Sequence, residues 1–299
     1  MSQNQNKIKK AISSISFDVD EKLLKSLKDQ LILIKTGGNA LTDDETKNEI
    51  ISQISILNQL GAKVVVVHGG GIEIKQLLDD VGVVSEFVGG HRKTDAKAIG
   101  YVEMALSGMV NKELVGLLNA NDVRAVGISG RDASMVRAKK RFHIVETDGV
   151  EKKHDLGFVG DVDTIDTTLI KTLVDADYIP VLSPVSSGET GESYNVNADM
   201  FAGHMAGALK AEKFVALTNI DGLLEDIDDP GSIIPELTPV EARNLFGSVI
   251  QGGMIPKIEA CLIALETGVK SSHIINGTKK EHLLRILLTI DRLGTEIKN

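Results

Sequence analysis

The sequence predicts an α/β protein: a three-layer α/β/α sandwich around a mainly parallel central sheet. Apolar strands at 31–35 (LILIK) and 63–68 (KVVVVH) each run into a glycine-rich turn and then into a helix. Strands that are apolar at every position are typical of a parallel sheet buried on both faces. The same rhythm returns in the second half of the chain, so we expect one sandwich with two halves.

Composition supports this class and argues against several functions. The 299 residues are 42% hydrophobic and 25% charged, as in ordinary globular proteins with a sizeable core. A net charge of −9 argues against a general nucleic-acid or anionic-membrane partner. The single cysteine, Cys261, excludes an intrachain disulfide and fits a reducing compartment. No apolar run has the length of a membrane span and the polar N-terminus is not a secretory signal, so we expect a cytoplasmic location.

The N-terminal region 1–30 should differ from the rest. Residues 1–10 are polar, and we expect them to be disordered. Residues 18–30 predict a surface helix, capped by Asp18 or Asp20. Its apolar stripe consists of Leu23, Leu24 and Leu27.

The remaining elements follow the order of the chain. We expect the other strands near 123–128, 178–184, 213–218 and 271–276, and the other helices near 43–60, 71–80, 94–107, 111–120, 197–209, 239–247, 255–267 and 279–290. Residues 134–162 alternate polar and apolar around turns, which predicts a small antiparallel excursion. We place the two halves at 31–180 and 181–299.

Two glycine motifs lie at the ends of the first strands. KTGGNA (35–40) places Lys35 beside Gly37 and Gly38, and HGGG (68–71) repeats the pattern at the next strand. Backbone N–H groups without flanking side chains form nests that bind anions, and a lysine adds a point charge. An ordinary turn with a surface lysine would explain the first motif alone, but three consecutive glycines indicate a function.

Other meanings of these glycines are excluded by missing partners. HGGG also occurs as the oxyanion loop of esterases, but the chain has no G-x-S-x-G elbow. It lacks the P-loop pattern and has no G-x-G-x-x-G after a strand. We interpret His68 as a packing or hydrogen-bonding residue rather than a base.

Three later motifs supply polar side chains. GGHRKTD (89–95) carries Arg92, whose forked guanidinium suits a carboxylate, although a surface salt bridge is the simpler reading. YNVNAD (194–199) offers Asn195 and Asp199, and Asp199 could instead cap the following helix. GGMIPK (252–257) places Lys257 at a helix start, after a proline suited to the first turn. All of these lie on connections at strand ends, where open α/β sheets bind ligands.

Taken together, the motifs resemble the amino-acid kinase family, and within it the branch that acts on N-acetyl-L-glutamate. Eleven segments stand in family order between Leu31 and Ile297: KTGGNA, VVHGGG, GGHRKTD, VEMALSG with VNKE (102–113), AVGISGRD (125–132), DLGFVGDV (155–162), YIPVLSPV (178–185), YNVNAD, LTNIDGL (217–223), GGMIPK and HIINGT (273–278). Carbamate, glutamate 5-, aspartate and uridylate kinases share the glycine loops but explain GHRKTD and YNVNAD less well.

The resemblance implies a role for each matched residue. Lys35 and Lys257 would stabilise the transferring phosphoryl group, and Asp199 would organise them. The substrate, N-acetyl-L-glutamate, would be held by Gly70, Gly71, Arg92 and Asn195. ATP would be bound by Gly37, Gly38, Thr218, Asp221, Gly222, Leu223, Gly252 and Met254. Mg²⁺ would be held mainly by phosphates and water, with no protein metal site.

This activity agrees with the residues present, because a carboxylate acceptor is already ionised at neutral pH and needs no general base. Two alternatives stay open: a kinase for a related substrate such as N-succinylglutamate, and a non-catalytic sensor of arginine or nucleotide with the same fold. The N-terminal helix resembles the one that joins dimers into hexamers in arginine-inhibited members, so a homodimer or a hexamer is expected. For the arginine site, His282, Gly294 and Thr295 match, but the position expected to be Glu reads Leu287.

Overall fold

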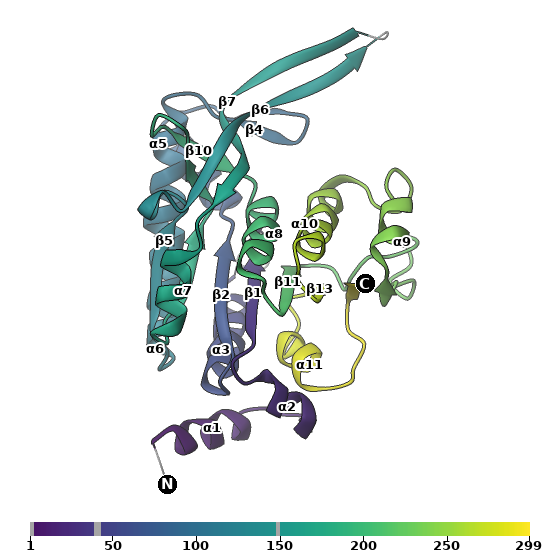
Figure 1. Ribbon diagram of the computed structural model, residues 1–299. Helices are drawn as coiled ribbons and strands as arrows, with labels where there is room; N and C mark the ends of the chain where they lie inside the picture. Colours follow the sequence, from purple (N-terminus) through teal and green to yellow (C-terminus); the bar gives the residue numbers. More distant parts are fainter. Residues whose placement is uncertain (1–2, 39–42, 148–149) are drawn as a thin grey trace.

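A computed structural model describes residues 3–38, 43–147 and 150–299. Among these residues, eight strands form a central sheet in the order β12-β14-β13-β11-β1-β2-β8-β5 (Figure 1). Their bounds are β1 Leu31–Thr36, β2 Lys63–His68, β5 Ala125–Ser129, β8 Ile179–Ser183, β11 Lys213–Thr218, β12 Glu236–Leu237, β13 Ser271–Asn276 and β14 Thr295–Lys298. All neighbours from β13 to β5 are parallel, whereas β14 runs antiparallel to β13. The predicted fold class is confirmed.

Helices cover both faces of this sheet because successive strand residues point to opposite sides. In β1, Leu33 packs with one core cluster, and Ile32 and Ile34 pack with the other. The cluster with Leu33 includes residues of α7 Thr168–Asp175, α8 Ala198–Leu209, α9 Pro239–Asn244 and α10 Ile255–Glu266. The opposite cluster includes residues of α2 Glu21–Leu27, α3 Asp44–Gln59, α6 Asn111–Ala120 and α11 His282–Leu288.

The expected disorder of residues 1–10 is wrong for the part that the structure describes. Helix α1 spans Gln3–Ser13. Ala11 is buried, and Ile8 and Ile15 pack beside it against the α3 side of the core, a helical spacing that the short polar stretch concealed. Helix α2 confirms the second expected helix, and the side chain of Asp20 caps it. Both helices lie at the end of the molecule opposite the long hairpin (Figure 1).

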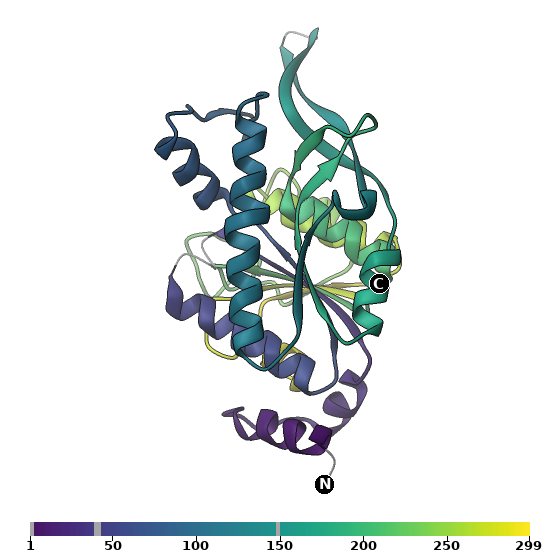
Figure 2. The ribbon, with the colours of Figure 1, turned by 90° about the vertical axis from the view of Figure 1, so that its left-hand side faces the viewer.

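The two helices expected at 94–107 and 111–120 are one rod. Helix α5 (Ala98–Glu103) continues through a π-helical segment, η2 (Met104–Val110), into α6, and it runs unbroken in Figure 2. A preceding helix α4 (Gly71–Asp80) and a short hairpin, β3 Glu86–Val88 with β4 His91–Lys93, connect it to β2. Gly108, which lies between the two expected helices, is inside the π-helical segment and does not end the rod.

The antiparallel excursion is present but longer than expected. Strands β6 (Val136–Thr147) and β7 (Val150–Ile165) form a hairpin that projects from the body (Figure 1). At its base they join β9 (Val185–Ser187) and β10 (Ser193–Val196) in a small closed barrel. The boundary expected between residues 180 and 181 falls inside β8, which pairs with β2 and β5, so the sheet passes through both halves without a break.

Candidate active site

Three charged side chains that are distant in sequence meet at the carboxyl end of the sheet. Lys35 lies near the end of β1, paired in register with Val67 on β2 and Ala216 on β11. Its Nζ is 2.8 Å from Oδ1 of Asp199, in the first turn of α8, and Nζ of Lys257 donates to Oδ2 of Asp199 at 3.0 Å from the first turn of α10. The structure therefore brings together the three predicted catalytic residues.

The cluster is buried, and burial sets its electrostatics. Lys35 is 5% exposed and Asp199 is 6% exposed. Burial lowers the pKa of Lys35, and the charge of Lys257 lowers it further, against the opposing effect of Asp199. Burial alone would raise the pKa of Asp199, but the two ammonium groups outweigh it and hold that pKa below the usual value. The carboxylate therefore stays ionised between two cations.

Asn197 rather than Asp199 caps helix α8. Its side-chain oxygen accepts hydrogen bonds from the N–H groups of Asp199 and Met200 at 2.9 and 3.1 Å. The alternative reading of Asp199 as the helix cap is therefore wrong, because its carboxylate points to the lysines instead.

A cavity of about 250 Å³ adjoins this cluster. Every residue predicted to hold the substrate lines it, namely Gly70, Gly71, Arg92 and Asn195, together with Gly38. Apolar residues that were not predicted as site residues also line it: Ile74, Phe87, Leu106, Val159 and Val196. The first turn of α4 starts at Gly71, and its N–H groups have no preceding helical turn to bond. The cavity thus combines donors for an anion with an apolar wall.

Arg92 reaches the cavity from β4. One guanidinium nitrogen donates to the carbonyl of Gly71 at 3.1 Å, another contacts Ser85, and the group stacks 4.7 Å from the Phe87 ring. The part of the chain that the structure describes places no carboxylate in an ion pair with Arg92. The charge of Asp79 acts on Arg92 without forming an ion pair with it, which leaves the guanidinium able to bind an acidic ligand.

Two glycine loops touch beside the lysines. Gly37 has φ +150°, and a Cβ placed on it would lie 2.7 Å from the backbone nitrogen of Gly69. Because that neighbour is backbone and cannot swing away, no larger residue fits there. Asn39 and Ala40 of the same motif lie outside the described residues.

Apart from Gly37 and Gly38, the residues predicted to bind nucleotide lie around the carboxyl end of β11. Thr218 ends that strand, and the Asp221 carboxylate receives Asn276 Nδ2 at 2.8 Å and Lys279 Nζ at 2.7 Å. Gly222, at φ +147°, packs against Thr295, whose hydroxyl accepts from the N–H of Leu223 at 2.8 Å. Gly252 and Met254 bound a short 3₁₀ turn before α10. These residues share the sheet edge with the lysines but do not line the 250 Å³ cavity.

An ion-pair network that we did not predict supports the cavity. Arg131 donates to both oxygens of Glu103 at 2.6 and 2.8 Å, and Ser193 donates to the same carboxylate at 2.8 Å. Ser193 begins β10, which carries Asn195. Glu103 lies in the VEMALSG motif and Arg131 in the AVGISGRD motif, so the two motifs could have indicated both residues as candidates for the site.

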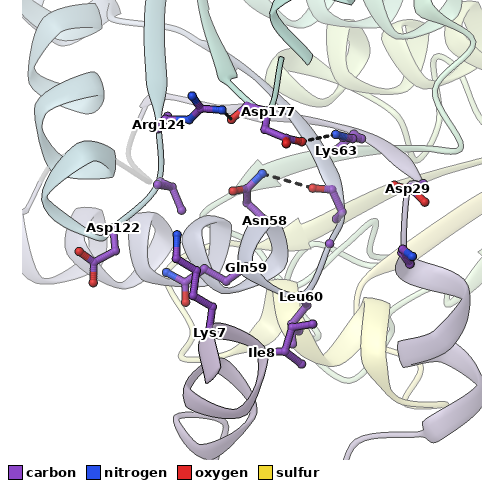
Figure 3. A pocket seen from close by; sticks show the side chains of 14 residues that line it. Lys7, Ile8, Asp29, Asn58, Gln59, Leu60, Lys63, Asp122, Arg124 and Asp177 are labelled. Atoms are coloured by element: carbon purple, nitrogen blue, oxygen red, sulfur yellow. Dashed lines mark hydrogen bonds and ion pairs between the residues drawn. The ribbon is translucent and has the colours of Figure 1, made fainter. Parts of the chain in front are cut away.

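A second cavity, of about 370 Å³, lies near α1 (Figure 3). Lys7, Asp29, Asp122 and Arg124 line it, and Lys63 pairs with Asp177 at its rim. None of the predicted site residues belongs to it.

The described residues also limit metal and membrane sites. Within residues 3–38, 43–147 and 150–299, no three His, Cys, Asp or Glu side chains cluster as metal ligands. The described helices include none with the length and apolarity of a bilayer span.

Comparison with known proteins identifies the family. Residues 30–276 match the model of the amino acid kinase family. The chain is 47% identical over 269 residues to an acetylglutamate kinase of Geobacter metallireducens, covering 89% of this chain and 91% of the relative. It is 40% identical to one of Methanococcus maripaludis, covering 90% and 92%.

Solved structures of similar fold support the family assignment. An N-acetylglutamate synthase of Neisseria gonorrhoeae, complexed with coenzyme A and N-acetyl-glutamate, aligns with a TM-score of 0.77 and 25% identity, covering 93% of this chain and 61% of that one. A carbamate kinase of Giardia lamblia shares the fold, with a TM-score of 0.63 at 17% identity over 91% and 99% of the two chains. With its family model matched over most of its length and relatives at 40–47% identity, this chain belongs to the amino acid kinase family.

Proposed function

We propose that the protein transfers the γ-phosphoryl group of ATP to the γ-carboxylate of N-acetyl-L-glutamate, forming N-acetyl-L-glutamyl 5-phosphate in arginine biosynthesis. The observation that carries the proposal is the Asp199 carboxylate held between Lys35 and Lys257 beside a cavity with an unpaired arginine. The relatives named acetylglutamate kinase support the choice of substrate.

The proposed step needs no proton transfer. An oxygen of the substrate carboxylate attacks the γ-phosphorus, the bond from that phosphorus to the β,γ-bridging oxygen breaks, and ADP leaves with the bond's electrons. Since a carboxylate is ionised near neutral pH, the protein has only to position the reactants and stabilise charge. Lys35 and Lys257 would do the latter, and Asp199 would keep both ammonium groups pointing at the phosphoryl oxygens.

The cavity would hold the acceptor. Arg92 would bind a carboxylate of the substrate with its fork, and Asn195 and the N–H groups of Gly70 and Gly71 would bind its remaining polar groups. The apolar side chains of Phe87 and Leu106 would contact its hydrocarbon part. A non-catalytic sensor would have no use for both lysines and Asp199, whose meeting supports catalysis.

The nucleotide would lie across the carboxyl ends of β1 and β11. Gly37 and Gly38 would donate N–H groups to its phosphates. Its remaining contacts would come from Thr218, Asp221, Gly222, Leu223, Gly252 and Met254. Mg²⁺ would have to be held by phosphate oxygens and water, because both oxygens of Asp199 already face lysines and the described residues offer no cage.

Assembly and regulation extend the proposal. We infer a cytoplasmic homodimer or hexamer, with arginine as a possible regulator; a related synthase is known complexed with L-arginine. His282 is half-buried at the start of α11, but Leu287 is buried in the core, which leaves that position without the expected acid. Light scattering with and without arginine, next to the activity, tests this part.

The acyl phosphate provides the decisive assay. Purified protein with ATP, Mg²⁺ and N-acetyl-L-glutamate should release ADP, and hydroxylamine should trap an equal amount of hydroxamate. N-succinyl-L-glutamate tests the acyl group, and substrate-free protein measures background hydrolysis. ADP release without hydroxamate, or a preference for the succinyl compound, would overturn the proposed function.

A further inference from the structure

A buried asparagine on the helical rod touches the end of β2. Asn111 follows the π-helical segment and is 1% exposed. Its Nδ2 lies 3.1 Å from Nε2 of His68 and 2.9 Å from the carbonyl oxygen of Val181 on β8. No part of the proposed chemistry uses Asn111 or His68.

The partners of this pair fix where its protons lie. The Val181 carbonyl can only accept, so the amide nitrogen of Asn111, not its oxygen, faces the strand. The second amide hydrogen then points at Nε2 of His68, which must accept. The other ring nitrogen, Nδ1, lies 2.8 Å from the carbonyl oxygen of Gly69, so it must donate. The ring is therefore neutral and carries its proton on Nδ1.

This chain of bonds ends in the HGGG loop. The His68 ring donates to the carbonyl of Gly69. The N–H of Gly69 donates to the carbonyl of Thr36 at 2.9 Å. The next two residues, Gly70 and Gly71, line the cavity. Leu106 from the π-helical segment packs on Gly70, where a Cβ would lie 2.7 Å from its methyl carbon. Neighbouring residues of the helical rod thus contact both His68 and Gly70.

We propose that Asn111 is a positioning residue for the substrate cavity, acting through His68 on the Gly69 carbonyl. It selects the ring tautomer that holds this carbonyl, and so fixes the direction in which the N–H of Gly70 points, because that N–H shares a peptide plane with the Gly69 carbonyl. The kinetic part of this inference rests on the proposed function, whereas the proton positions do not.

A neighbouring glycine and lysine support the assignment. Lys112 donates to the side-chain oxygen of Asn111 at 3.2 Å and to the carbonyl of Gly127 on β5 at 2.9 Å. A Cβ on Gly127 would lie 1.8 Å from that same oxygen. Residues of the motifs VNKE and AVGISGRD, Lys112 and Gly127, therefore both contribute to the seat of the Asn111 amide.

The environment of the ring agrees with a neutral histidine. Burial lowers the pKa of His68 to about 4; its hydrogen bond to Gly69 opposes this shift and the charge of Lys112 adds to it. The ring then keeps one proton throughout the neutral range.

The first experiment reads the tautomer directly. Long-range ¹H–¹⁵N correlation spectra of the full chain, with the His68 signals assigned by loss in His68→Gln, should show Nδ1 protonated and Nε2 unprotonated from pH 6 to 8. A proton on Nε2, or titration of the ring within this range, would overturn the proposal whatever the kinetics of the variants show.

The second experiment tests whether Asn111 acts through His68. With N-acetyl-L-glutamate varied, Asn111→Leu should lower kcat/KM on the order of ten- to a hundredfold, since a displacement of about 1 Å can have such an effect. His68→Gln should lower kcat/KM by a similar factor. The double variant should have the same kcat/KM as the less active single variant, because both changes interrupt the same chain of hydrogen bonds. Multiplied losses in the double variant would overturn the proposal.

Asn119→Leu is the matched control. It lies on the same helix, its side-chain oxygen accepts the N–H of Ala125 at 2.8 Å, and it does not line the cavity. Its kcat/KM should stay near wild type, and an equal loss in both asparagine variants would contradict a specific role for Asn111. If wild-type protein lacks activity on N-acetyl-L-glutamate, the proposed function fails while the tautomer result still decides the relay.

Discussion

The side-chain oxygen of Asn197 accepts a hydrogen bond from the N–H of Asp199 at 2.9 Å, two residues into the same motif. Because Asn197 satisfies the helix terminus, the Asp199 carboxylate needs no backbone partner and can hold Lys35 and Lys257. Within the YNVNAD motif, the amide of Asn197 therefore caps the helix, and the carboxylate of Asp199 binds the two lysines.

Lys35→Ala should lower kcat by about a hundredfold or more, because a buried cation aimed at the phosphoryl group is lost. ADP release coupled to hydroxamate formation measures it. Lys63→Ala is the control, since Lys63 pairs with Asp177 far from the cluster. Near-normal kcat in Lys35→Ala would contradict its assigned role.

Asp199→Asn should destabilise the fold as well as slow the reaction. The change keeps the side chain's shape but leaves the buried Lys35 ammonium without its counter-charge, which costs about 3–5 kcal/mol in comparable buried pairs. Urea unfolding measures the loss, and adding Lys35→Met should recover part of it. No recovery in the double variant would show that the pair does not set this stability.

Arg92→Lys should raise the KM for N-acetyl-L-glutamate by roughly ten- to a hundredfold, since a lysine keeps the charge but loses the two-pronged contact with a carboxylate. The KM for ATP should change little, because Arg92 lines the cavity proposed for the acceptor. Steady-state kinetics with each substrate varied in turn separates the two constants. An equal rise in both would argue that Arg92 only supports the β3–β4 hairpin.

Stability should fall as the pH drops from about 6.5 toward 4, in part through His68. Burial lowers the pKa of this ring to about 4 in the folded protein, whereas an unfolded histidine takes up its proton near pH 6.5. In that window the unfolded state binds more protons, so the free energy of unfolding declines by up to about 1.4 kcal/mol per pH unit and levels off below the folded pKa.

Unfolding curves for wild type and His68→Gln across this range test the point. The variant should show a shallower slope by about one proton. Burial also lowers the pKa of His273 to about 4. Because His273 is present in both proteins, its contribution to the pH dependence of stability is the same in each. Identical slopes would contradict the buried neutral state of His68.

Local patterns predicted most of the fold, because the hydrophobic periodicity of a strand or a helix can be recognised within about ten to twenty residues. The strands at 31–35 and 63–68 and the Asp20 cap are where they were expected. The continuous rod from 98 to 120 was not foreseen, because glycine is a poor helix former in isolation, whereas in the structure Gly108 is exposed and the buried residues before it pack against α4. Helix α1 was missed because its few apolar residues have meaning only against α3.

The site was predictable where charged residues stood in glycine motifs. Lys35, Asp199 and Lys257 meet as expected, and Arg92 and Asn195 share one cavity. The contacts of Asn111 with His68 and of Arg131 with Glu103 were not predictable, since they join residues 43 and 28 positions apart through the tertiary fold. His68 was correctly interpreted as a hydrogen-bonding residue, but its partner could not be named.

The sheet order also suggests how the chain could be divided. Strand β1 pairs with β2 on one side and β11 on the other, and the left-handed Lys210 ends α8 just before β11. A cut at that turn would leave Lys35 and Asp199 on one fragment and Lys257 on the other. Activity would then require β1 and β11 to zip together, so such a split enzyme could report the association of any two proteins fused to its halves.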